Sequence, residues 1–264
     1  SQGDGNHFLF VGRLKSTGET AIVTHHGSRG LGAGLYKKGM RTAEKYRQEL
    51  SPQTPKGSAW IPAYSKDGAN YWEALKVIEV WTEASHFAIH DLIIDRYNGA
   101  HSALECAATV RDRFFNPHNF VFKSADSSGD LYWHAKGATP GWYPRTLVPL
   151  NMAEPILITH GTGAPNALGF LPHGAGRNMS RTQYLRENTE HPFPDGIDAR
   201  FYSGKPDHSE LPGAYKSAAQ VKAAIAEFNL AEIIDEVMPY GSIMAGELER
   251  FWEKPNADSA TQKP

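Results

Sequence analysis

The feature that most constrains the fold is the stretch NYWEALKVIEVWTEASHFAIHDLIIDR at residues 70–96. Large side chains recur in it at steps of three to five residues: Trp72, Leu75, Ile78, Trp81, His86, Ile89 and Ile93. Steps of this size gather side chains on one face of an α-helix, whereas a half-buried strand alternates at every second residue. The spacing therefore predicts one long, mostly buried helix against which the rest of the chain packs.

Shorter elements are predicted on both sides of this helix. Further helices are expected over about 39–50, 100–113 and 215–236. Strands are expected in three places: the pair HFLFVGRL and TAIVTHHG joined by KSTGE, the hairpin FVFKS and DLYWHAK around ADSSGD, and the buried strand PILITHG. This mixture predicts an α+β fold with mixed sheets and helices. We expect one domain over residues 1–255 and a disordered tail over 256–264.

The net charge and the single cysteine limit the partners and the cellular compartment that the sequence predicts. The net charge of -2 gives no general attraction to nucleic acid or membranes, so a nucleic-acid partner would need a local patch. Cys106 is the single cysteine, which indicates no internal disulfide, a core thiol and a reducing, cytoplasmic location. No apolar run approaches the roughly 20 residues of a membrane span. The start SQGDGNHF has neither a signal peptide nor a methionine, and we expect a processed or truncated end.

Most of the 12 histidines fall into two groups by sequence context. Five lie in predicted helices or plain loops and are expected to be structural: His86, His90, His101, His191 and His208. Six lie at strand ends beside small residues: His7, His25, His26, His118, His134 and His173. Glycine-rich strand ends let backbones approach ligands closely, and neutral imidazole binds transition metals. The second group therefore predicts a metal or phosphate site.

The loop LPHGAGRNMSR at residues 171–181 carries the most specific chemistry. It places His173 on a flexible, glycine-containing segment followed by Arg177 and Arg181. Guanidinium groups give bidentate hydrogen bonds to phosphate oxygens, and an exposed neutral imidazole is a nucleophile. We interpret the loop as a histidine that attacks a phosphorus atom while the arginines hold the phosphate oxygens. Gly174 and Gly176 are expected to leave room for the ligand.

A second interpretation comes from HHGSRGLGAG, which follows a predicted strand and is similar to a dinucleotide-binding turn. Tyr132 and Lys136 also have the Y-x-x-x-K spacing of short-chain dehydrogenases. That pair must share one helix face, whereas DLYWHAKGATPG is strand-like and closed by glycine and proline. No acidic residue ends a clear second strand about 20 residues after the glycines. We therefore favour the phosphate-transfer interpretation.

Taken in chain order, several motifs resemble those of the RtcB-type RNA ligases, which join RNA ends with GTP and Mn2+. GDGNHF resembles the family's G-x-G-N-H-F, HHGSRGLG its H-x-G-S-R-G-x-G, HAKGAT its H-R-K-G-A-T, and PGAYK its P-x-A-Y-K. HGAGRNMSR agrees with H-G-A-G-R-x-M-S-R at every fixed position. The matches span residues 3–216, and His118–Asn119 and PYGSI extend them. The resemblance implies the family's α+β fold around a central metal and nucleotide cleft.

The resemblance also implies a reaction. His173 corresponds to the histidine that attacks the α-phosphorus of GTP and carries a covalent GMP. In the family GMP then passes to an RNA 3′-phosphate, the 5′-hydroxyl of a second RNA attacks, and GMP leaves. A 2′,3′-cyclic phosphate is first hydrolysed at the same centre. The expected function is RNA repair or tRNA splicing, with RNA ends and a nucleoside triphosphate as partners and no membrane.

Further residues take roles from the same resemblance. His7, His25 and His118 correspond to histidine ligands of a paired Mn2+ site, with His26 outside it. Asn6 and Arg29 correspond to positions near the phosphates. The family also uses an Asp and a bridging Cys from a segment upstream of G-N-H-F, which this sequence lacks. We expect those ligands from elsewhere, in a partner segment or subunit.

The base-binding positions depart from the family. Phe10 and Met244 stand where the family has Glu and Lys, and Asn166 stands where its Ser contacts the base, whereas Tyr215 is retained. Glu and Lys read guanine by hydrogen bonds that Phe and Met cannot make. GTP remains the expected nucleotide, with ATP as an alternative. Two other functions stay open: a non-catalytic RNA-end-binding protein, and a metal-dependent phosphohydrolase acting on cyclic phosphates.

Overall fold

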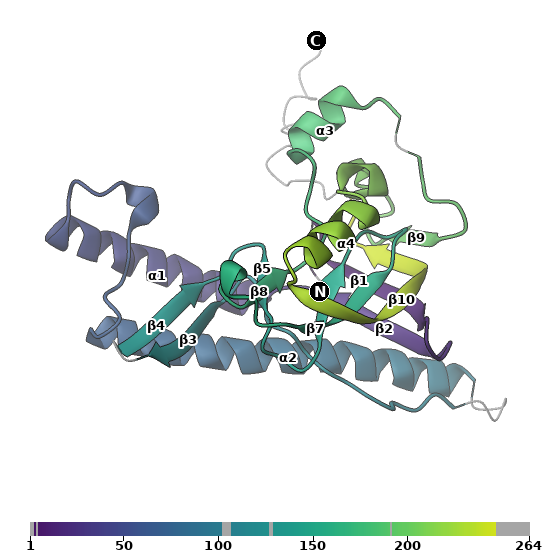
Figure 1. Ribbon diagram of the computed structural model, residues 1–264, viewed down its shortest axis with the longest axis horizontal. Coiled ribbons are helices and arrows are strands. Elements are labelled where there is room, and N and C mark those ends of the chain that lie inside the picture. The colour runs from purple at the N-terminus through teal and green to yellow at the C-terminus, as the bar shows by residue number, and fades with distance from the viewer. Residues whose placement is uncertain (1–2, 4, 102–106, 127–128, 191, 247–264) are drawn as a thin grey trace, which may run out of the picture.

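The computed structural model describes residues 3, 5–101, 107–126, 129–190 and 192–246, and within them the fold is α+β, as predicted (Figure 1). The helices are α1 (Arg29–Leu50), α2 (Lys66–Ala100), α3 (Arg181–Glu187) and α4 (Ala218–Glu227). The strands are β1 (Phe8–Leu14), β2 (Thr20–His25), β3 (Val121–Asp126), β4 (Gly129–His134), β5 (Ala138–Pro140), β6 (Thr146–Pro149), β7 (Ile156–Gly161), β8 (Phe170–Pro172), β9 (Asp198–Phe201) and β10 (Ala231–Met244). Single 3-10 turns lie at η1 (Lys56–Ser58), η3 (Pro165–Ala167), η4 (His208–Glu210) and η5 (Pro212–Ala214).

A central sheet with the order β2-β1-β10-β7-β6 forms the frame of the molecule, and β9 joins it as a parallel partner of β10. The 14-residue β10 holds the sheet together, because its first half pairs with β7 and its second half with β1. All pairs other than β9 with β10 are antiparallel. This topology, together with Tyr132 lying on strand β4, overturns the dinucleotide-binding alternative, which needs a parallel sheet and a Tyr–Lys pair on a helix.

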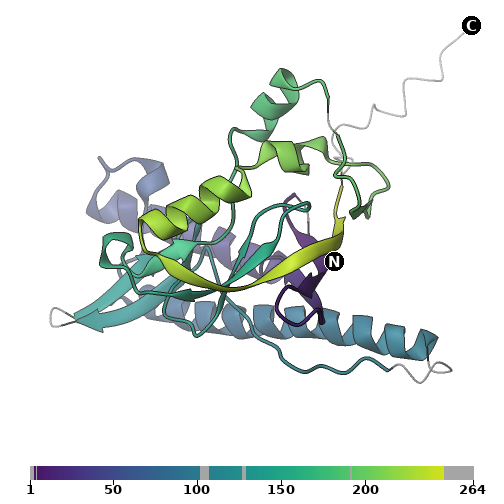
Figure 2. The same cartoon turned by 45° about the vertical axis from the view of Figure 1, so that its right-hand side comes forward.

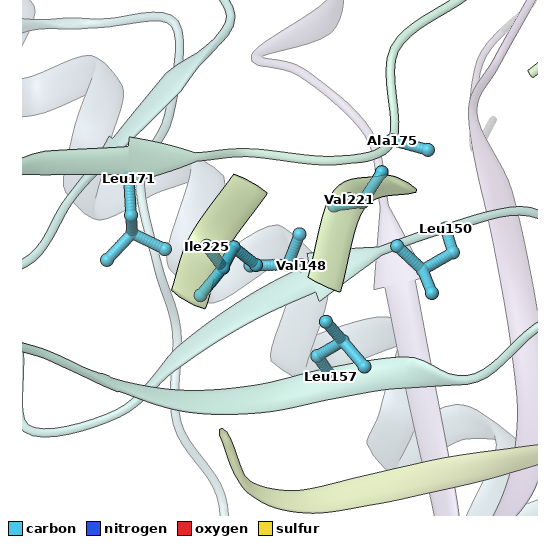
Figure 3. Close-up of a cluster of buried hydrophobic side chains, with 7 residues drawn as sticks. All are labelled: Val148, Leu150, Leu157, Leu171, Ala175, Val221 and Ile225. Carbon is cyan, nitrogen blue, oxygen red and sulfur yellow. The ribbon is translucent and has the colours of Figure 1, made fainter. Parts of the chain in front are cut away.

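The hydrophobic core lies between this sheet and α4. Val148, Leu150 and Leu157 from the β6–β7 region face Val221 and Ile225 of α4, as Figure 3 shows. Ala175, which lies two residues after His173, belongs to the same cluster. The loop that carries the candidate nucleophile is therefore anchored in the core.

The two long helices differ from their sequence predictions. Helix α2 runs beneath the sheet and the β3–β4 hairpin (Figures 1 and 2) and is longer than predicted, but only Ile78 and His86 are buried along it. Val77 and Val80 are about two-thirds exposed, at 64% and 67%, so the expectation of a mostly buried helix was wrong. Helix α1 begins at Arg29, ten residues earlier than predicted. The glycines at its start suggested a turn. Further along the helix, Gly39 packs against Tyr71, and a Cβ at Gly39 would lie 2.6 Å from the tyrosine ring.

Two other predicted helices were wrong. Residues 107–113 form no helix, and residues 102–106, including Cys106, lie outside the described residues. The predicted helix 215–236 is instead the ten-residue α4 followed by β10. Asn229 adopts a left-handed φ of 50° between them, and pairing with β1 and β7 then draws the following residues into the sheet.

The remaining strand predictions are confirmed: β1, β2, the β3–β4 hairpin and the buried β7 all lie where the sequence placed them. His191 and the tail 256–264 lie outside the described residues, and the extent of the domain to residue 255 stays a prediction. No helix in the described part of the chain is long and apolar enough to span a membrane.

Candidate active site

Four histidine rings, here called the histidine cluster, come together from four different segments. His7 precedes β1, His25 ends β2, His118 precedes β3, and His173 follows β8. The ring centre of His25 lies 6.1 Å from that of His7, 4.6 Å from that of His118 and 6.4 Å from that of His173. The rings of His118 and His173 stack with centres 5.1 Å apart. The fold thus brings together the three predicted metal ligands and the predicted nucleophile.

Burial favours the neutral form of three rings of this cluster. It lowers the pKa of His25 well below its usual value of 6.5, and the neighbouring His118 and His7 lower it further. Burial likewise lowers the pKa of His118, to about 4, and that of His173. Within the described structure, the buried Nδ1 of His173 has no hydrogen-bond partner. Neutral rings have free lone pairs, which is the state needed by a metal ligand and by a nucleophile.

Arg29 contacts the cluster through His7. Its Nη1 lies 3.1 Å from Nδ1 of His7, and because a guanidinium can only donate, the ring nitrogen accepts. Arg29 is the first residue of α1 and has a left-handed φ of 52°, a strained conformation for a non-glycine residue. Such strain concentrates at functional sites. Nδ1 of His7 is therefore available to a metal only when Arg29 turns away.

The loop after β8 is held more firmly than its sequence suggests. Ala175 N donates to Pro149 O at 3.0 Å, Lys216 N donates to Gly176 O at 3.1 Å, and Asn178 N donates to Ala214 O at 3.2 Å. The predicted flexible loop is thus pinned to two other segments. Gly176 has a φ of 71°, so its glycine serves the backbone conformation, and a Cβ at Gly174 would lie 3.1 Å from Pro149 O.

The two predicted phosphate-binding arginines converge on an acid that the sequence analysis missed. Arg177, Arg181, Glu210 and Tyr215 form what we call the arginine cluster. Nη2 of Arg177 and Nη2 of Arg181 lie 2.7 and 2.6 Å from Oε1 of Glu210, and the Tyr215 hydroxyl donates to Oε2. The Glu210 side chain is 1% exposed. The Arg177 contact is an ion pair without hydrogen-bond alignment, since Nη2 has no hydrogen-bond partner in the described structure.

A cavity of about 380 Å³ joins the two clusters. His25 and His173 line it together with the whole arginine cluster. Asn6 and the three residues Phe10, Tyr215 and Met244, predicted to surround the base, also line it. Phe10 and Met244 are almost fully buried, so they present apolar walls. Asn166 is not among the lining residues and lies exposed on η3.

A second cavity of about 500 Å³ reaches the histidine cluster from the side of α2. It shares four lining residues with the first: Phe8, His25, Pro149 and His173. His118 lines this second cavity only. His173 therefore lines both cavities, and so does His25.

The other histidines separate from the cluster. His26 stacks on His86 with ring centres 3.6 Å apart, and Thr24 Oγ1 lies 2.7 Å from Nδ1 of His86 and 2.9 Å from Nε2 of His90. These contacts tie β2 to α2, which is the structural role expected for His86 and His90. His134 is exposed at the end of β4.

The donor set can be tested against the metal predicted from sequence. His7, His25 and His118 provide nitrogen donors, and no group of three or more His, Cys, Asp or Glu in the described structure is arranged at metal-binding geometry. Imidazole suits nitrogen-preferring divalent ions, whereas Mn2+ favours oxygen ligands. The three rings offer nitrogen donors for one divalent ion but are not arranged as a site as they lie in the described structure, and they lack the oxygen ligands that two Mn2+ ions prefer.

Sequence reasoning missed Glu210 and Lys136 as residues of the cavity. Glu210 lies two residues before the P-G-A-Y-K motif, and two closely spaced arginines, of which Arg177 is mostly buried, need an acid when no ligand is present. That requirement was the available signal. Lys136 was considered only for the dehydrogenase alternative.

Comparisons with known proteins find the family whose motifs this sequence resembles. A sequence model of the family described as tRNA-splicing ligase RtcB matches residues 1–245. The tRNA-splicing ligase RtcB of Pyrococcus horikoshii is 24% identical over 91% of this chain and 32% of its own length. The RNA-splicing ligases RtcB of Escherichia coli K12 and Mycobacterium bovis are 26% and 25% identical, over 88% and 92% of this chain and 57% and 64% of their own lengths. The chain thus spans 32–64% of the length of these three relatives.

Proposed function

The chain belongs to the RtcB family, and on that premise we propose that it joins RNA ends bearing a 3′-phosphate or 2′,3′-cyclic phosphate to RNA ends bearing a 5′-hydroxyl. His173 is the covalent nucleotide acceptor in this proposal. The observation that carries it is that His173, a member of the histidine cluster, lines the same cavity as the arginine cluster, with a lowered pKa and, within the described structure, one buried nitrogen unpartnered.

In the first step a ring nitrogen of His173 attacks the α-phosphorus of a nucleoside triphosphate. An N–P bond forms, the bond from the α-phosphorus to the bridging oxygen breaks, and pyrophosphate leaves. Arg177 and Arg181 compensate the charge on the phosphate oxygens, because guanidinium groups in a dry site stabilise the charge that develops. Glu210 holds both arginines in place before the substrate arrives.

In the second step an oxygen of the RNA 3′-phosphate attacks the nucleotide phosphorus, and the N–P bond to His173 breaks. The 5′-hydroxyl oxygen of the other RNA then attacks the 3′-phosphorus, and the nucleoside monophosphate leaves. A cyclic phosphate first takes up water to give the 3′-phosphate. Asn6 lines the cavity, and Asn6 and Arg29 would contact the phosphates in the roles that the family resemblance implies.

A divalent ion held by His7, His25 and His118 would supply Lewis-acid polarisation of a phosphate oxygen. Turning of Arg29 away from His7 would free both the ring nitrogen and a guanidinium for phosphate. We propose Mn2+ and GTP as the metal and the nucleotide. Asp and Cys ligands from a partner segment or subunit would complete a paired site that the nitrogen donors do not complete themselves.

Ligation of two labelled oligoribonucleotides tests this function. One carries a 3′-phosphate and the other a 5′-hydroxyl, with GTP and Mn2+ present. We expect a joined product from wild type and none from His173→Ala, with the exposed His160, which lies outside every motif, giving the control His160→Ala that keeps activity. Opening of a cyclic phosphate without joining would instead support the phosphohydrolase, and RNA binding without either reaction would support the binding protein.

A further inference from the structure

The loop that carries His173 continues directly from a short two-stranded ribbon. β5 pairs with β8 through Ala138–Pro172, Thr139–Leu171 and Pro140–Phe170. At the inner end, His173 N lies 3.5 Å from Gly137 O, and at the outer end Gly141 N donates to Gly169 O at 2.8 Å. The ribbon therefore leads in a straight line from the candidate nucleophile to the residues after Gly141.

The outer end of this ribbon presents an exposed aromatic side chain. Trp142 is 53% exposed, and the adjoining Leu168 is 63% exposed. The indole packs edge-to-face on Phe170 and Phe122, with ring centres 5.0 and 5.8 Å apart and interplanar angles of 75° and 88°. A large apolar surface is thus held in a defined orientation while more than half of the side chain stays open to solvent.

The backbone beneath Trp142 is tightly packed. A Cβ on Gly161 of β7 would lie 2.2 Å from Gly141 O, so the ribbon crosses β7 at a distance that only glycine permits. This contact couples the position of Trp142 to the central sheet. The ring therefore forms a fixed platform, in contrast to a side chain on a free loop.

The inner end of the ribbon carries positive charge. Lys136 is exposed, lies one residue before Gly137, and lines the 380 Å³ cavity together with His173. A ligand that reaches the nucleophile along the ribbon thus meets an aromatic face first and a cation next to the reacting centre. Aromatic faces that stack bases and cations that follow the backbone are the two elements of single-stranded nucleic-acid sites.

We propose that Trp142 stacks on a base of the single-stranded RNA whose 3′-phosphate reacts at His173, while Lys136 contacts its terminal phosphates. The proposal rests on the proposed function. Trp142 lies five residues from Gly137, which is about 16 Å along an extended ribbon. A helically stacked strand advances about 3.4 Å per nucleotide and an extended strand more, so the stacked base lies within about five nucleotides of the reacting end.

The test combines protein variants with RNA that lacks single bases. Binding of a 3′-phosphorylated decamer is measured by fluorescence anisotropy for wild type, Trp142→Ala, Trp142→Phe and Tyr202→Ala. Tyr202 is 88% exposed at the end of β9, away from the ribbon (Figure 1), and serves as the matched control. Abasic nucleotides are placed in turn at each of the last five positions and at the 5′ end.

We expect Trp142→Ala to weaken binding by about 5- to 150-fold, Trp142→Phe to restore most of it, and Tyr202→Ala to change nothing. One abasic position near the 3′ end should weaken wild-type binding by a similar factor and add nothing to Trp142→Ala. A purely structural role for Trp142 would give independent, multiplicative losses at every position, which overturns the proposal.

Labelling of His173 by nucleotide separates this proposal from the proposed function. Trp142→Ala should form the adduct as wild type does. Adduct formation and ligation in wild type, with no coupling between Trp142 and any base, would overturn the platform alone. Absence of adduct, ligation and RNA binding in wild type would overturn the proposed function and the platform together.

Discussion

The histidine cluster and the arginine cluster meet at one cavity, which His25 and His173 line together with the four residues of the arginine cluster, but the two clusters handle charge in opposite ways. In the arginine cluster the buried Glu210 compensates two guanidinium groups, so the charges are present and paired. In the histidine cluster burial lowers the pKa of His25, His118 and His173, so charge is avoided. The first cluster is prepared for an anion that competes with or joins Glu210. The second offers lone pairs, and it gains most from a cation.

The largest expected effect is that of acid on the buried histidines, which include His25 and His118 of the histidine cluster and also His86. Burial holds the pKa of His86 at about 3 and that of His118 at about 4, and it lowers that of His25, all below the unfolded value near 6.5. The unfolded chain therefore binds more protons, and stability is full above pH 6.5 and falls as pH drops toward 4. These three rings contribute a slope on the order of 4 kcal/mol per pH unit near pH 5, and the lowered pKa values of His26, His90 and His173 act in the same direction.

Urea unfolding between pH 7 and 5 measures this slope. His118→Gln should reduce it by about 1.4 kcal/mol per pH unit, because one titrating ring is gone. The exposed His160 provides the control, and His160→Ala should leave the slope as in wild type. A pH-independent stability over this range would show that the buried rings are charged in the folded state.

Removal of Glu210 should destabilise the fold through the arginine cluster. Glu210→Ala leaves two guanidinium groups without their buried acid, and breaking a buried ion pair in this way costs about 3–5 kcal/mol of folding free energy. Asp198→Ala is the control, because Asp198 and Arg200 form an exposed pair worth about 1 kcal/mol or less. Equal losses in the two variants, measured by thermal or urea unfolding, would contradict the compensating role of Glu210.

A divalent cation should stabilise the fold by binding to the histidine cluster. Mn2+ at about 100 times its dissociation constant should stabilise the wild-type fold by about 2.7 kcal/mol, and Zn2+ provides a nitrogen-preferring comparison. His25→Ala should lose the metal-dependent part of the melting temperature. The exposed His134 is outside the cluster, so His134→Ala should keep it. Stabilisation that survives in His25→Ala would place the ion elsewhere.

The smallest expected effect concerns the nucleotide base. Phe10 and Met244 line the cavity without hydrogen-bonding groups for guanine, and donors left without a partner cost about 1–3 kcal/mol. Discrimination between GTP and ATP should therefore be weak. Side-by-side measurements of adduct formation or binding test this expectation, and a preference for GTP above about 1000-fold would contradict it. Asn166→Ala should have little effect, because Asn166 does not line the cavity.

The strands were predictable from sequence because their signals are local. In β1, β2 and β7 the apolar residues form short runs ended by turn residues, and the hairpin of β3 and β4 encloses its own turn. The helices were less predictable because their boundaries depend on distant partners. Helix α1 accommodates four glycines, among them Gly39 against Tyr71, and β10 exists because β1 and β7 pair with it.

Site residues that belong to a sequence motif could be predicted. A residue whose role is to compensate the charge of other residues could not. His7, His25, His118 and His173 were named from motifs, and the fold brings them within one cluster. Glu210 was missed because an acid on a remote 3-10 turn has no local signal. The flexibility expected of the His173 loop was wrong because backbone hydrogen bonds to two other segments cannot be read from its glycines.

Mapping of the covalent adduct shows whether His173 accepts the nucleotide. The chain is incubated with α-labelled GTP or ATP and Mn2+, denatured, and digested for mass spectrometry. The account predicts an acid-labile, alkali-stable nucleotidyl group on His173 of wild type and no adduct in His173→Ala. A labelled residue other than His173, or an undiminished adduct in His173→Ala, would contradict it.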